Sequence, residues 1–367
     1  MSKILISGYY GFSNAGDEAL LTAILASLYA IEPEADITVI SGNPSDTTAK
    51  HRVKSIFRFD AGKILSAMGQ ADLLLSGGGS LLQDVTSKRS LAYYLSMIAL
   101  AKLRGKKVML FAQGIGPIRN GFMRLLTRFI CRRADVITVR DRDSAEELVR
   151  LGLEREKIEV TADSVLTLAP VSKDAGRQIL KKAGLVLTEP IIGVSVRSWP
   201  ENRRCLQQLA AGLARISRRY DAQVIVLPLQ YPMDVEASKA VRNFIPPLAQ
   251  KVVLLEEAYP TEVFLSLIGN FNLLVGMRLH ALIFAAVMDV PFLAISYDPK
   301  VDSFVRAVGS EPVGTVENLL AEKVVEAACA LWGKIPVVQK ERIATMRALA
   351  LSNAEKAFAL LGDKNKK

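Results

Sequence analysis

Short apolar runs alternate with longer helical stretches along almost the whole chain, and this alternation restricts the fold more than any other feature of the sequence. The helical segments are expected at 16–31, 60–69, 88–104, 119–133 and 143–151. The strand-type runs before and between them are KILISG (3–8), ITVIS (37–41), ADLLLSG (71–77), KVMLFAQG (107–114) and DVITVRD (135–141), followed by IEV near 158–160. A repeated strand–helix–strand pattern predicts a parallel sheet with helices on both faces.

The same pattern occurs a second time. Its runs are PIIGVSVRS (190–198), AQVIVLPLQ (222–230), KVVLLEEA (251–258), NLLVGMR (272–278) and PFLAISYDPK (291–300). A length of 367 residues suits two such domains, each with its own core. We therefore predict an α/β fold of two Rossmann-like, doubly wound domains that face each other across a cleft. The expected parts are 1–168, 185–336, and a C-terminal helix and tail over 337–367.

Charge and cysteine content narrow the partners and the compartment. Lys and Arg number 47 against 37 Asp and Glu, a formal net charge of +10 that favours anionic partners. The three cysteines, Cys131, Cys205 and Cys329, are scattered, so neither a disulfide framework nor a zinc site can be recognised, and no metal is expected. The N-terminal segment lacks the apolar region of a signal peptide, and the apolar stretch 91–101 is too short to span a bilayer. We expect a cytoplasmic protein.

The loop GYYGFSNAGDEALL follows the first strand and opens a helix. Its glycines leave the backbone free to approach a ligand, and a helix N-terminus attracts anions, so Asn14 and Gly16 are candidate binding residues. The glycine spacing does not match G-x-G-x-x-G, which makes a dinucleotide site a weak interpretation. Asp17 is a helix cap in one interpretation and a base for a sugar hydroxyl in another, and the sequence alone favours the cap.

Two further glycine loops follow the next strands of the first domain. SGGGSLLQD (76–84) contributes Gly78 and Gly79, and AQGIGP (112–117) contributes Gln113 and Gly114. Each could be a tight turn by itself. Together they predict a ligand surface, because the carboxyl ends of parallel strands lie at the same edge of a sheet.

Arginines end one strand-type run in each domain. Arg140 stands beside Asp141 in VITVRDRD, and Arg197 precedes Trp199 in GVSVRSWP. An arginine at a strand end can hold a carboxylate or phosphate with two parallel hydrogen bonds. A surface ion pair for Arg140 and stacking on the aromatic ring for Arg197 are the alternatives.

The stretch VGMRLHALIFAAV (275–287) places Arg278 and His280 in the first turn of an otherwise apolar helix. Lys300 follows the next strand-type run, in SYDPKVDSF. A lone histidine among apolar residues is more often a structural group than a catalyst. Three cationic or protonatable groups on neighbouring loops nevertheless indicate an anion site.

These loops together resemble the polysaccharide pyruvyl transferase family, and the N-terminal loop resembles its CsaB-type branch, which acts in cell-wall biogenesis and S-layer anchoring. NAGDEA, SGGGSLLQD, AQGIGP, VRDRDSAEELVRLG, ADS, VGMRLHALIFA and ISYDPKVDSF occur in the order typical of that family. The resemblance covers nearly the whole chain, and the ordered set is more specific than any single motif.

The resemblance implies a GT-B glycosyltransferase-like fold and an enzyme that transfers pyruvate from phosphoenolpyruvate to two hydroxyls of a sugar as a cyclic ketal, releasing phosphate. In the CsaB-type branch the acceptor is N-acetylmannosamine of a lipid-linked secondary cell-wall polysaccharide precursor. Donor-binding positions of the family match Arg140, Arg278, His280 and Lys300, with Arg142 or Arg197 as alternatives to Arg140. Phosphoenolpyruvate is a co-substrate, and no cofactor is implied.

The chemistry explains these residue types. Arginines and a lysine suit the carboxylate and phosphate of the donor. His280 is the expected acid, which would deliver the proton to the methylene carbon of phosphoenolpyruvate or assist the departure of phosphate, contributing on the order of 10²–10⁴-fold. Arg278 and Lys300 would stabilise the leaving phosphate, and Asp17 is a provisional base or acceptor-positioning residue.

Segment 119–133 has Arg124, Arg128 and Arg132 at helical spacing, with Phe122, Leu125, Leu126 and Phe129 at other positions. Such a helix can rest on an anionic membrane surface, which would be a peripheral contact at the inner face of the cell membrane. More often the apolar side packs inward and the charges face water, and we favour that interpretation.

Two other functions compete with pyruvyl transfer. A GT-B glycosyltransferase with a nucleotide-sugar donor would need a carboxylate for the ribose, which Glu256 or Glu257 could supply. A non-catalytic carbohydrate- or nucleic-acid-binding protein is the second alternative, but the sequence shows no aromatic platform or RNA motif, so no nucleic-acid partner is expected. The acceptor sugar, its linkage, the ketal stereochemistry and the oligomeric state cannot be read from the sequence.

Overall fold

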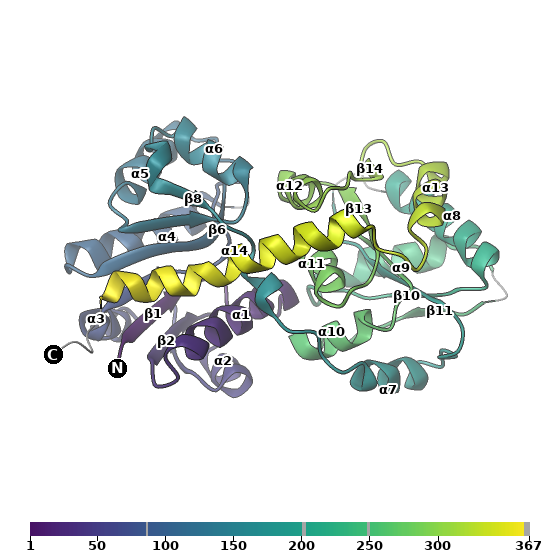
Figure 1. Ribbon diagram of the computed structural model, residues 1–367, viewed down its shortest axis with the longest axis horizontal. Coiled ribbons are helices and arrows are strands. Elements are labelled where there is room, and N and C mark those ends of the chain that lie inside the picture. Colours follow the sequence, from purple (N-terminus) through teal and green to yellow (C-terminus); the bar gives the residue numbers. More distant parts are fainter. Residues whose placement is uncertain (86, 200–202, 248–249, 363–367) are drawn as a thin grey trace. The chain divides into compact units, whose positions relative to one another are not determined.

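The computed structural model describes residues 1–85, 87–199, 203–247 and 250–362. The chain divides into two compact units (Figure 1). The first unit contains Met1–Phe12, Asp17–Leu168 and Thr345–Lys367, and the second contains Ser13–Gly16 and Ala169–Ala344. Each unit is an α/β sandwich built on its own parallel sheet. None of the described helices is both long enough and apolar enough to cross a membrane.

The sheet of the first unit has the strand order β3-β2-β1-β4-β6-β7-β8, with β5 paired to β6. All of its strand pairs are parallel. The strands are β1 (Lys3–Ser7), β2 (Asp36–Ser41), β3 (Lys54–Phe57), β4 (Leu73–Ser76), β5 (Gly79–Leu82), β6 (Lys107–Ile115), β7 (Val136–Val139) and β8 (Ile158–Val160).

Helices pack on both faces of this sheet and explain its continuous apolar strands. Along β1, Ile4 and Ile6 enter the core under α1, while Leu5 between them enters the core on the opposite face. The helices are α1 (Ala15–Ile31), α2 (Pro44–His51), α3 (Ala61–Gln70), α4 (Lys88–Leu103), α5 (Gly121–Cys131) and α6 (Arg142–Arg150). Five of these helices are capped at the N-terminus by a polar side chain that accepts a hydrogen bond from a backbone N–H group. The capping residues are Asn43, Asp60, Ser87, Asn120 and Asp141.

The second unit repeats the arrangement with the order β11-β10-β9-β12-β13-β14, again with parallel pairs. Its strands are β9 (Ile191–Ser195), β10 (Gln223–Val226), β11 (Val252–Leu254), β12 (Leu273–Gly276), β13 (Phe292–Ser296) and β14 (Gly314–Thr315). Its helices are α7 (Asp174–Lys182), α8 (Arg203–Tyr220), α9 (Val235–Phe244), α10 (Thr261–Ile268), α11 (Leu279–Val287), α12 (Pro299–Ala307) and α13 (Ala321–Leu331). The predicted pair of Rossmann-like, doubly wound domains is confirmed.

The long C-terminal helix α14 (Val337–Leu361), yellow in Figure 1, belongs partly to each unit. From Thr345 onward it is part of the first unit, where Ala354 and Ala357 are buried in the core that also contains α1. Thr161 Oγ1 donates to Asn353 Oδ1 over 3.1 Å in the same region. The last helix therefore completes a hydrophobic core that begins with the first strand.

The strand order of each sheet reverses at one place, between β1 and β4 in the first unit and between β9 and β12 in the second. In doubly wound folds, connections from the two central strands leave in opposite directions at such a place, and a crevice typically forms at the carboxyl ends of the strands. Ligands of doubly wound sheets bind at such switch points. The candidate site residues are therefore expected at these two edges.

Candidate functional site

Four loops of the second unit carry polar side chains at the carboxyl edge of its sheet. Arg197 follows β9, Gln230 and Asp234 follow β10, and the remaining residues follow the two strands on the other side of the switch point. Those residues are Arg278 and His280 after β12, and Tyr297, Asp298 and Lys300 after β13.

Arg278 is fixed by the loop after β10. Its guanidinium donates through Nη2 to Gln230 Oε1 over 3.0 Å and forms an ion pair with the fully buried Asp234. The other carboxylate oxygen of Asp234 accepts from the backbone N–H of Gln230 over 2.9 Å. Nε of Arg278 is buried and has no hydrogen-bond partner among the described residues. The arginine is thus held on one side, and its Nε–H is a buried donor without a partner among the described residues.

The side chain of Tyr297 lies among three cationic side chains of this edge, Arg197, Arg278 and Lys300. The guanidinium carbon of Arg197 lies 4.7 Å from the centroid of its ring, and Lys300 Nζ lies 5.5 Å from the same centroid. Burial alone would raise the pKa of the Tyr297 phenol, but the charges of Lys300, Arg197 and Arg278 lower it below its ordinary value. The positive charge is partly balanced, because Lys300 Nζ lies 3.2 Å from Asp298 Oδ2.

His280 lies against a segment from the beginning of the chain. A Cβ atom at Gly16 would stand 2.0 Å from His280 Nδ1, so only glycine fits at that position. The segment is attached to the loop after β10, because Ala15 N donates to the carbonyl of Leu229 over 3.0 Å and Asn14 forms an isolated bridge with Gln230. Three residues predicted from distant motifs, Asn14, Gly16 and His280, are therefore neighbours.

In the first unit, Asp17 and the glycines after β4 lie at the switch point between β1 and β4. A Cβ at Gly79 would be 3.3 Å from Asp17 Oδ1, and Gly79 has a positive φ of 90°, which favours glycine. A Cβ at Gly78 would be 3.0 Å from Leu20 on α1. The glycines therefore allow α1 to approach the β4 loop closely, with the Asp17 carboxylate at the interface between them.

Arg140 lies at the carboxyl end of β7 and is buried. Its guanidinium contacts Asp141 Oδ2 at 3.3 Å and Asp163 Oδ2 at 3.2 Å, and it donates to Ser80 Oγ over 2.9 Å. Burial would lower the pKa of this guanidinium, but Asp163 and Asp141 raise it. Arg140 is therefore already matched by two carboxylates, as expected of a buried structural ion network.

Gln113 and Gly114 are part of the same region. Nε2 of the fully buried Gln113 donates to Ser76 Oγ over 2.8 Å, which ties β6 to the end of β4. A Cβ at Gly114 would stand 2.7 Å from Arg140 Nη2, so this glycine makes room for the guanidinium. Both residues support the arrangement of the loops around Arg140.

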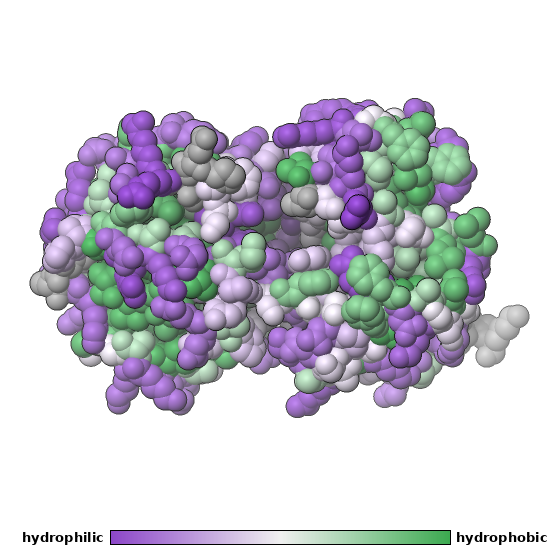
Figure 2. Space-filling view, turned by 180° about the vertical axis from the view of Figure 1, so that it is seen from behind, coloured by the Kyte–Doolittle hydropathy of each residue, from purple (hydrophilic) through white to green (hydrophobic). Residues whose placement is uncertain are grey.

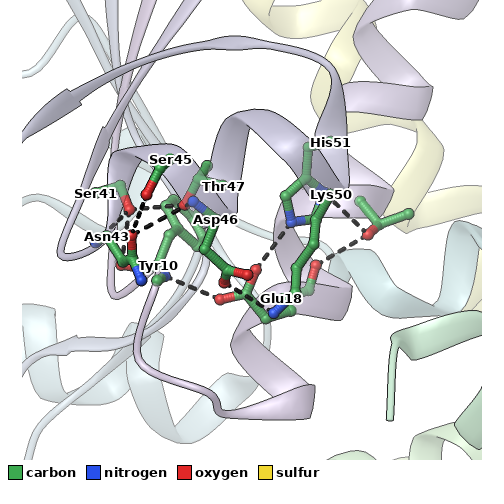
Figure 3. Close-up of polar contacts among 11 residues, drawn as sticks. Tyr10, Glu18, Ser41, Asn43, Ser45, Asp46, Thr47, Lys50 and His51 are labelled. Carbon is green, nitrogen blue, oxygen red and sulfur yellow. Dashed lines mark hydrogen bonds and ion pairs between the residues drawn. The ribbon is translucent and has the colours of Figure 1, made fainter.

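The only other histidine of the sequence, His51, supports the glycine loop after β1. Figure 3 shows His51 and Glu18 pointing toward each other from α2 and α1. His51 Nε2 lies 2.9 Å from Glu18 Oε2, and Glu18 Oε1 accepts from the backbone N–H of Gly11 over 2.9 Å. Because both side chains are nearly inaccessible, at 7% and 9% exposure, this pair fixes the loop and does not face a ligand.

An arginine surrounded by aromatic rings lies at the same edge of the first sheet, just after β3. The guanidinium of Arg58 is 4.5 Å from the ring centroid of Tyr93, 4.9 Å from that of Phe59 and 5.4 Å from that of Phe12. Phe59 is 69% exposed. Within the described chain, no carboxylate is paired with Arg58. This aromatic platform could not be recognised in the sequence, because its rings come from three separate segments.

The structure thus groups the predicted residues into two sets. Arg197, Arg278, His280, Lys300, Asn14 and Gly16 lie in the second unit, and Asp17, Gly78, Gly79, Gln113, Gly114 and Arg140 lie in the first. Tyr297, Asp234 and Gln230 were not predicted from the sequence, although SYDPK places Tyr297 beside a predicted residue. Among the residues that the structure describes, no group of three or more His, Cys, Asp or Glu side chains could hold a metal ion.

Comparisons with known proteins agree with the resemblance of the motifs. The model of a family described as polysaccharide pyruvyl transferase matches residues 14–299. The amylovoran biosynthesis protein AmsJ of Erwinia amylovora is 23% identical, over 87% of this chain and 89% of that protein.

Solved structures show the same fold at low sequence identity. A putative UDP-N-acetylglucosamine 2-epimerase of Listeria monocytogenes has a TM-score of 0.69 at 14% identity, over 98% of this chain and 95% of that one. Anabaena Alr3699/HepE, solved in complex with UDP and glucose, has a TM-score of 0.62 at 13% identity, over 98% and 97%. These likenesses show a GT-B-like fold.

Proposed function

Because this chain belongs to the polysaccharide pyruvyl transferase family, we propose that it transfers pyruvate from phosphoenolpyruvate to two hydroxyl groups of a sugar, forming a cyclic ketal and releasing phosphate. The proposed acceptor is N-acetylmannosamine of a lipid-linked secondary cell-wall polysaccharide precursor. A role in polysaccharide biosynthesis agrees with the relative AmsJ, which is named for the biosynthesis of amylovoran.

The observation that carries this proposal is the group of cations around Tyr297. Arg197, Arg278 and Lys300 come from three loops at one sheet edge, and all three act on the phenol of Tyr297. Phosphoenolpyruvate carries a carboxylate and a phosphate, and guanidinium forks and an ammonium group suit these anions. We assign Arg197 to the donor in preference to Arg140, because Arg140 is occupied by Asp141 and Asp163.

His280 is the proposed acid. It gives a proton to the methylene carbon of phosphoenolpyruvate, which makes C2 an electrophile that the first sugar hydroxyl attacks. The C2–O bond to phosphate then breaks, the phosphate leaves with the bonding electrons, and the second hydroxyl closes the ketal. Each hydroxyl loses its proton, so one proton returns to His280 and the other leaves with phosphate. Arg278 and Lys300 stabilise the charge that grows on the phosphate oxygens.

We assign acceptor binding to the carboxyl edge of the first sheet. Asp17 lies over Gly79 there and directly follows Gly16 in the chain, the residue that packs on His280. A carboxylate can accept a hydrogen bond from a sugar hydroxyl and orient it for attack. The rings of Phe59 and Tyr93 beside Arg58 provide an aromatic surface for a second sugar unit.

The direct test is mass spectrometry of synthetic disaccharide acceptors ending in N-acetylmannosamine after incubation with phosphoenolpyruvate. The wild-type protein should add one pyruvate ketal per acceptor and release phosphate. His280→Asn should lower kcat about 10²–10⁴-fold while the Kd for phosphoenolpyruvate changes little, because the acid acts on the reacting carbon. Unchanged mass of every acceptor with the wild-type protein would refute the reaction, and full activity of His280→Asn would refute the acid.

A matched control separates the cation cluster from general effects of charge. Lys323 is an exposed lysine of the same unit, with Nζ 2.9 Å from Glu326 on α13. Lys323→Met should leave the donor Kd unchanged, whereas Lys300→Met should raise it about 10-fold or more, as expected for the loss of a charge-assisted hydrogen bond. Equal effects of the two substitutions would argue against the assignment of Lys300.

A nucleotide-sugar donor is the second candidate, because several solved structures with this fold contain UDP or a UDP-sugar. The expected carboxylate Glu256 lies 3.5 Å from Lys239 on α9. Calorimetric titration distinguishes the two donors. We expect phosphoenolpyruvate to bind and UDP-N-acetylglucosamine not to compete with it; the reverse result would favour the second candidate.

A further inference from the structure

Helix α5 presents three large apolar side chains to solvent. Phe122 is 70% exposed, Leu125 is 64% exposed and Phe129 is 50% exposed. Residues spaced three and four apart lie on one face of a helix, so the three form a continuous row. Figure 2 shows hydrophobic residues scattered among hydrophilic ones over one face of the molecule, so a single exposed apolar residue needs no explanation. Three on one helix face do.

The packing of α5 fixes which face points outward. Met123, Thr127, Ile130 and Cys131 are buried against the first unit. Arg124, which was expected among the solvated charges, donates to the carbonyl of Ile118 and to Glu147 Oε1 over 3.0 and 2.9 Å. The expectation that the apolar side of 119–133 packs inward was therefore wrong for Phe122, Leu125 and Phe129. Hydrophobic residues occur on two faces of this helix, and only tertiary packing selects one of them.

Positive charge borders the exposed row. Arg128, Arg132 and Arg133 are exposed, and the guanidinium of Arg133 lies 3.6 Å from the ring centroid of Phe129. That of Arg132 lies 5.3 Å from the same centroid. The sequence from 118 to 134 contains five arginines and neither Asp nor Glu. Aromatic and aliphatic groups framed by arginines, without acids, match a surface of acyl chains and anionic headgroups.

We propose that this α5 face, formed by Phe122, Leu125 and Phe129 with Arg128, Arg132 and Arg133, docks on a membrane containing anionic phospholipid. The apolar side chains enter the boundary between headgroups and acyl chains, while the guanidinium groups remain at the level of the phosphates. Docking is independent of the transfer reaction, but it would hold the enzyme where a lipid-linked acceptor is located.

The test is sedimentation with vesicles, without phosphoenolpyruvate or acceptor. We use vesicles of phosphatidylcholine alone and vesicles containing phosphatidylglycerol. The wild-type protein should bind the anionic vesicles at least about tenfold more strongly, and salt should weaken that binding. The double variant Phe122→Ser/Leu125→Ser should lose about tenfold or more in binding, because two apolar contacts are removed. Arg128→Gln/Arg132→Gln should lower binding to the anionic vesicles alone.

Leu103→Ser is the matched control, because Leu103 is 85% exposed at the end of α4 and lies outside the α5 face. It should bind vesicles as the wild type does. The proposal would be overturned if Phe122→Ser/Leu125→Ser bound anionic vesicles as strongly as the wild type. It would also be overturned if the wild-type protein bound both vesicle types equally. A wild-type dimer that the double variant converts to monomer without any vesicle binding would overturn it as well. Pyruvylation of a water-soluble disaccharide by the double variant should equal that of the wild type, so failure of docking and failure of the proposed reaction are distinguishable.

Discussion

At the scale of single residues, the function of a charged side chain depends on which partners packing gives it. Arg140 and Arg278 both follow a strand of a parallel sheet. Arg140 contacts two carboxylates, whereas Arg278 contacts one carboxylate and keeps a buried Nε without a partner among the described residues. Arg278 is therefore less fully neutralised than Arg140, whose two carboxylates tie it to its own loop.

We expect Tyr297 to make the proposed binding of phosphoenolpyruvate sensitive to pH. Its pKa lies below the ordinary 10.0 because Lys300, Arg197 and Arg278 act against the effect of burial. When the pH rises through that lowered pKa, the phenol becomes a phenolate, and its negative charge offsets the cations that we propose to hold the donor. The Kd of phosphoenolpyruvate should therefore rise more steeply between neutral pH and 10.0 in the wild type than in Tyr297→Phe. Calorimetry at several pH values measures this difference, and parallel curves would contradict it.

Sequence patterns were sufficient to identify most of these residues, but they did not predict which groups surround each side chain. Arg278, His280 and Lys300 could be identified because they follow strand-type runs within a few residues, where parallel strands expose their ends. Asp234 could not, because its contact with Arg278 joins positions 44 residues apart. The same limitation applies to Arg58 and its aromatic rings.

At the level of elements, the absence of a side chain at Gly16 lets the first turn of α1 contact His280 closely. The imidazole of His280, in the first turn of α11, occupies the space that a Cβ would need.

Substitution of Gly16 tests this packing. Gly16→Ala should cost about 1–3 kcal/mol of unfolding free energy, because the new methyl group overlaps His280, and should lower kcat by displacing the imidazole. Gly62→Ala is the control, since Gly62 lies in α3 and a Cβ added there would have its nearest neighbouring atom 3.7 Å away; it should be neutral or stabilising by about 0.4–1 kcal/mol.

Urea unfolding and steady-state kinetics measure both effects. Adding His280→Ala to Gly16→Ala should recover the lost stability without recovering activity. If Gly16→Ala has the stability and the kcat of the wild type, the contact with His280 is not important for the site.

At the scale of the whole molecule, α14 joins the two ends of the chain in one hydrophobic core. Ala354 and Ala357 pack with Ile4 and Ile6 of β1 and with Leu28 of α1. Small side chains allow α14 to lie close to its neighbours, so the stability of the first unit depends on residues that follow the second unit in sequence.

A charge introduced on the buried side of α14 tests this dependence. Ala354→Glu should destabilise the first unit by about 3 kcal/mol or more, because an unpaired carboxylate would be buried. Ala348→Glu places the same side chain on an exposed position of the same helix and should change the free energy of unfolding by less than about 0.5 kcal/mol. Hydrogen exchange of the β1 amides reports on the first unit directly. Equal protection in the two variants would show that the core does not require this helix.

The sequence alone was sufficient to predict the class of fold, and it indicated which loops are candidates for the chemistry. Alternating strand-type and helical runs are local patterns, and a parallel sheet places every loop after a strand at the same edge. Tertiary structure decided which arginine is neutralised, which tyrosine lies among the cations, which face of α5 meets solvent and which core receives α14. These outcomes depend on contacts between residues far apart in sequence, whose energies are set by packing and desolvation and not by local periodicity.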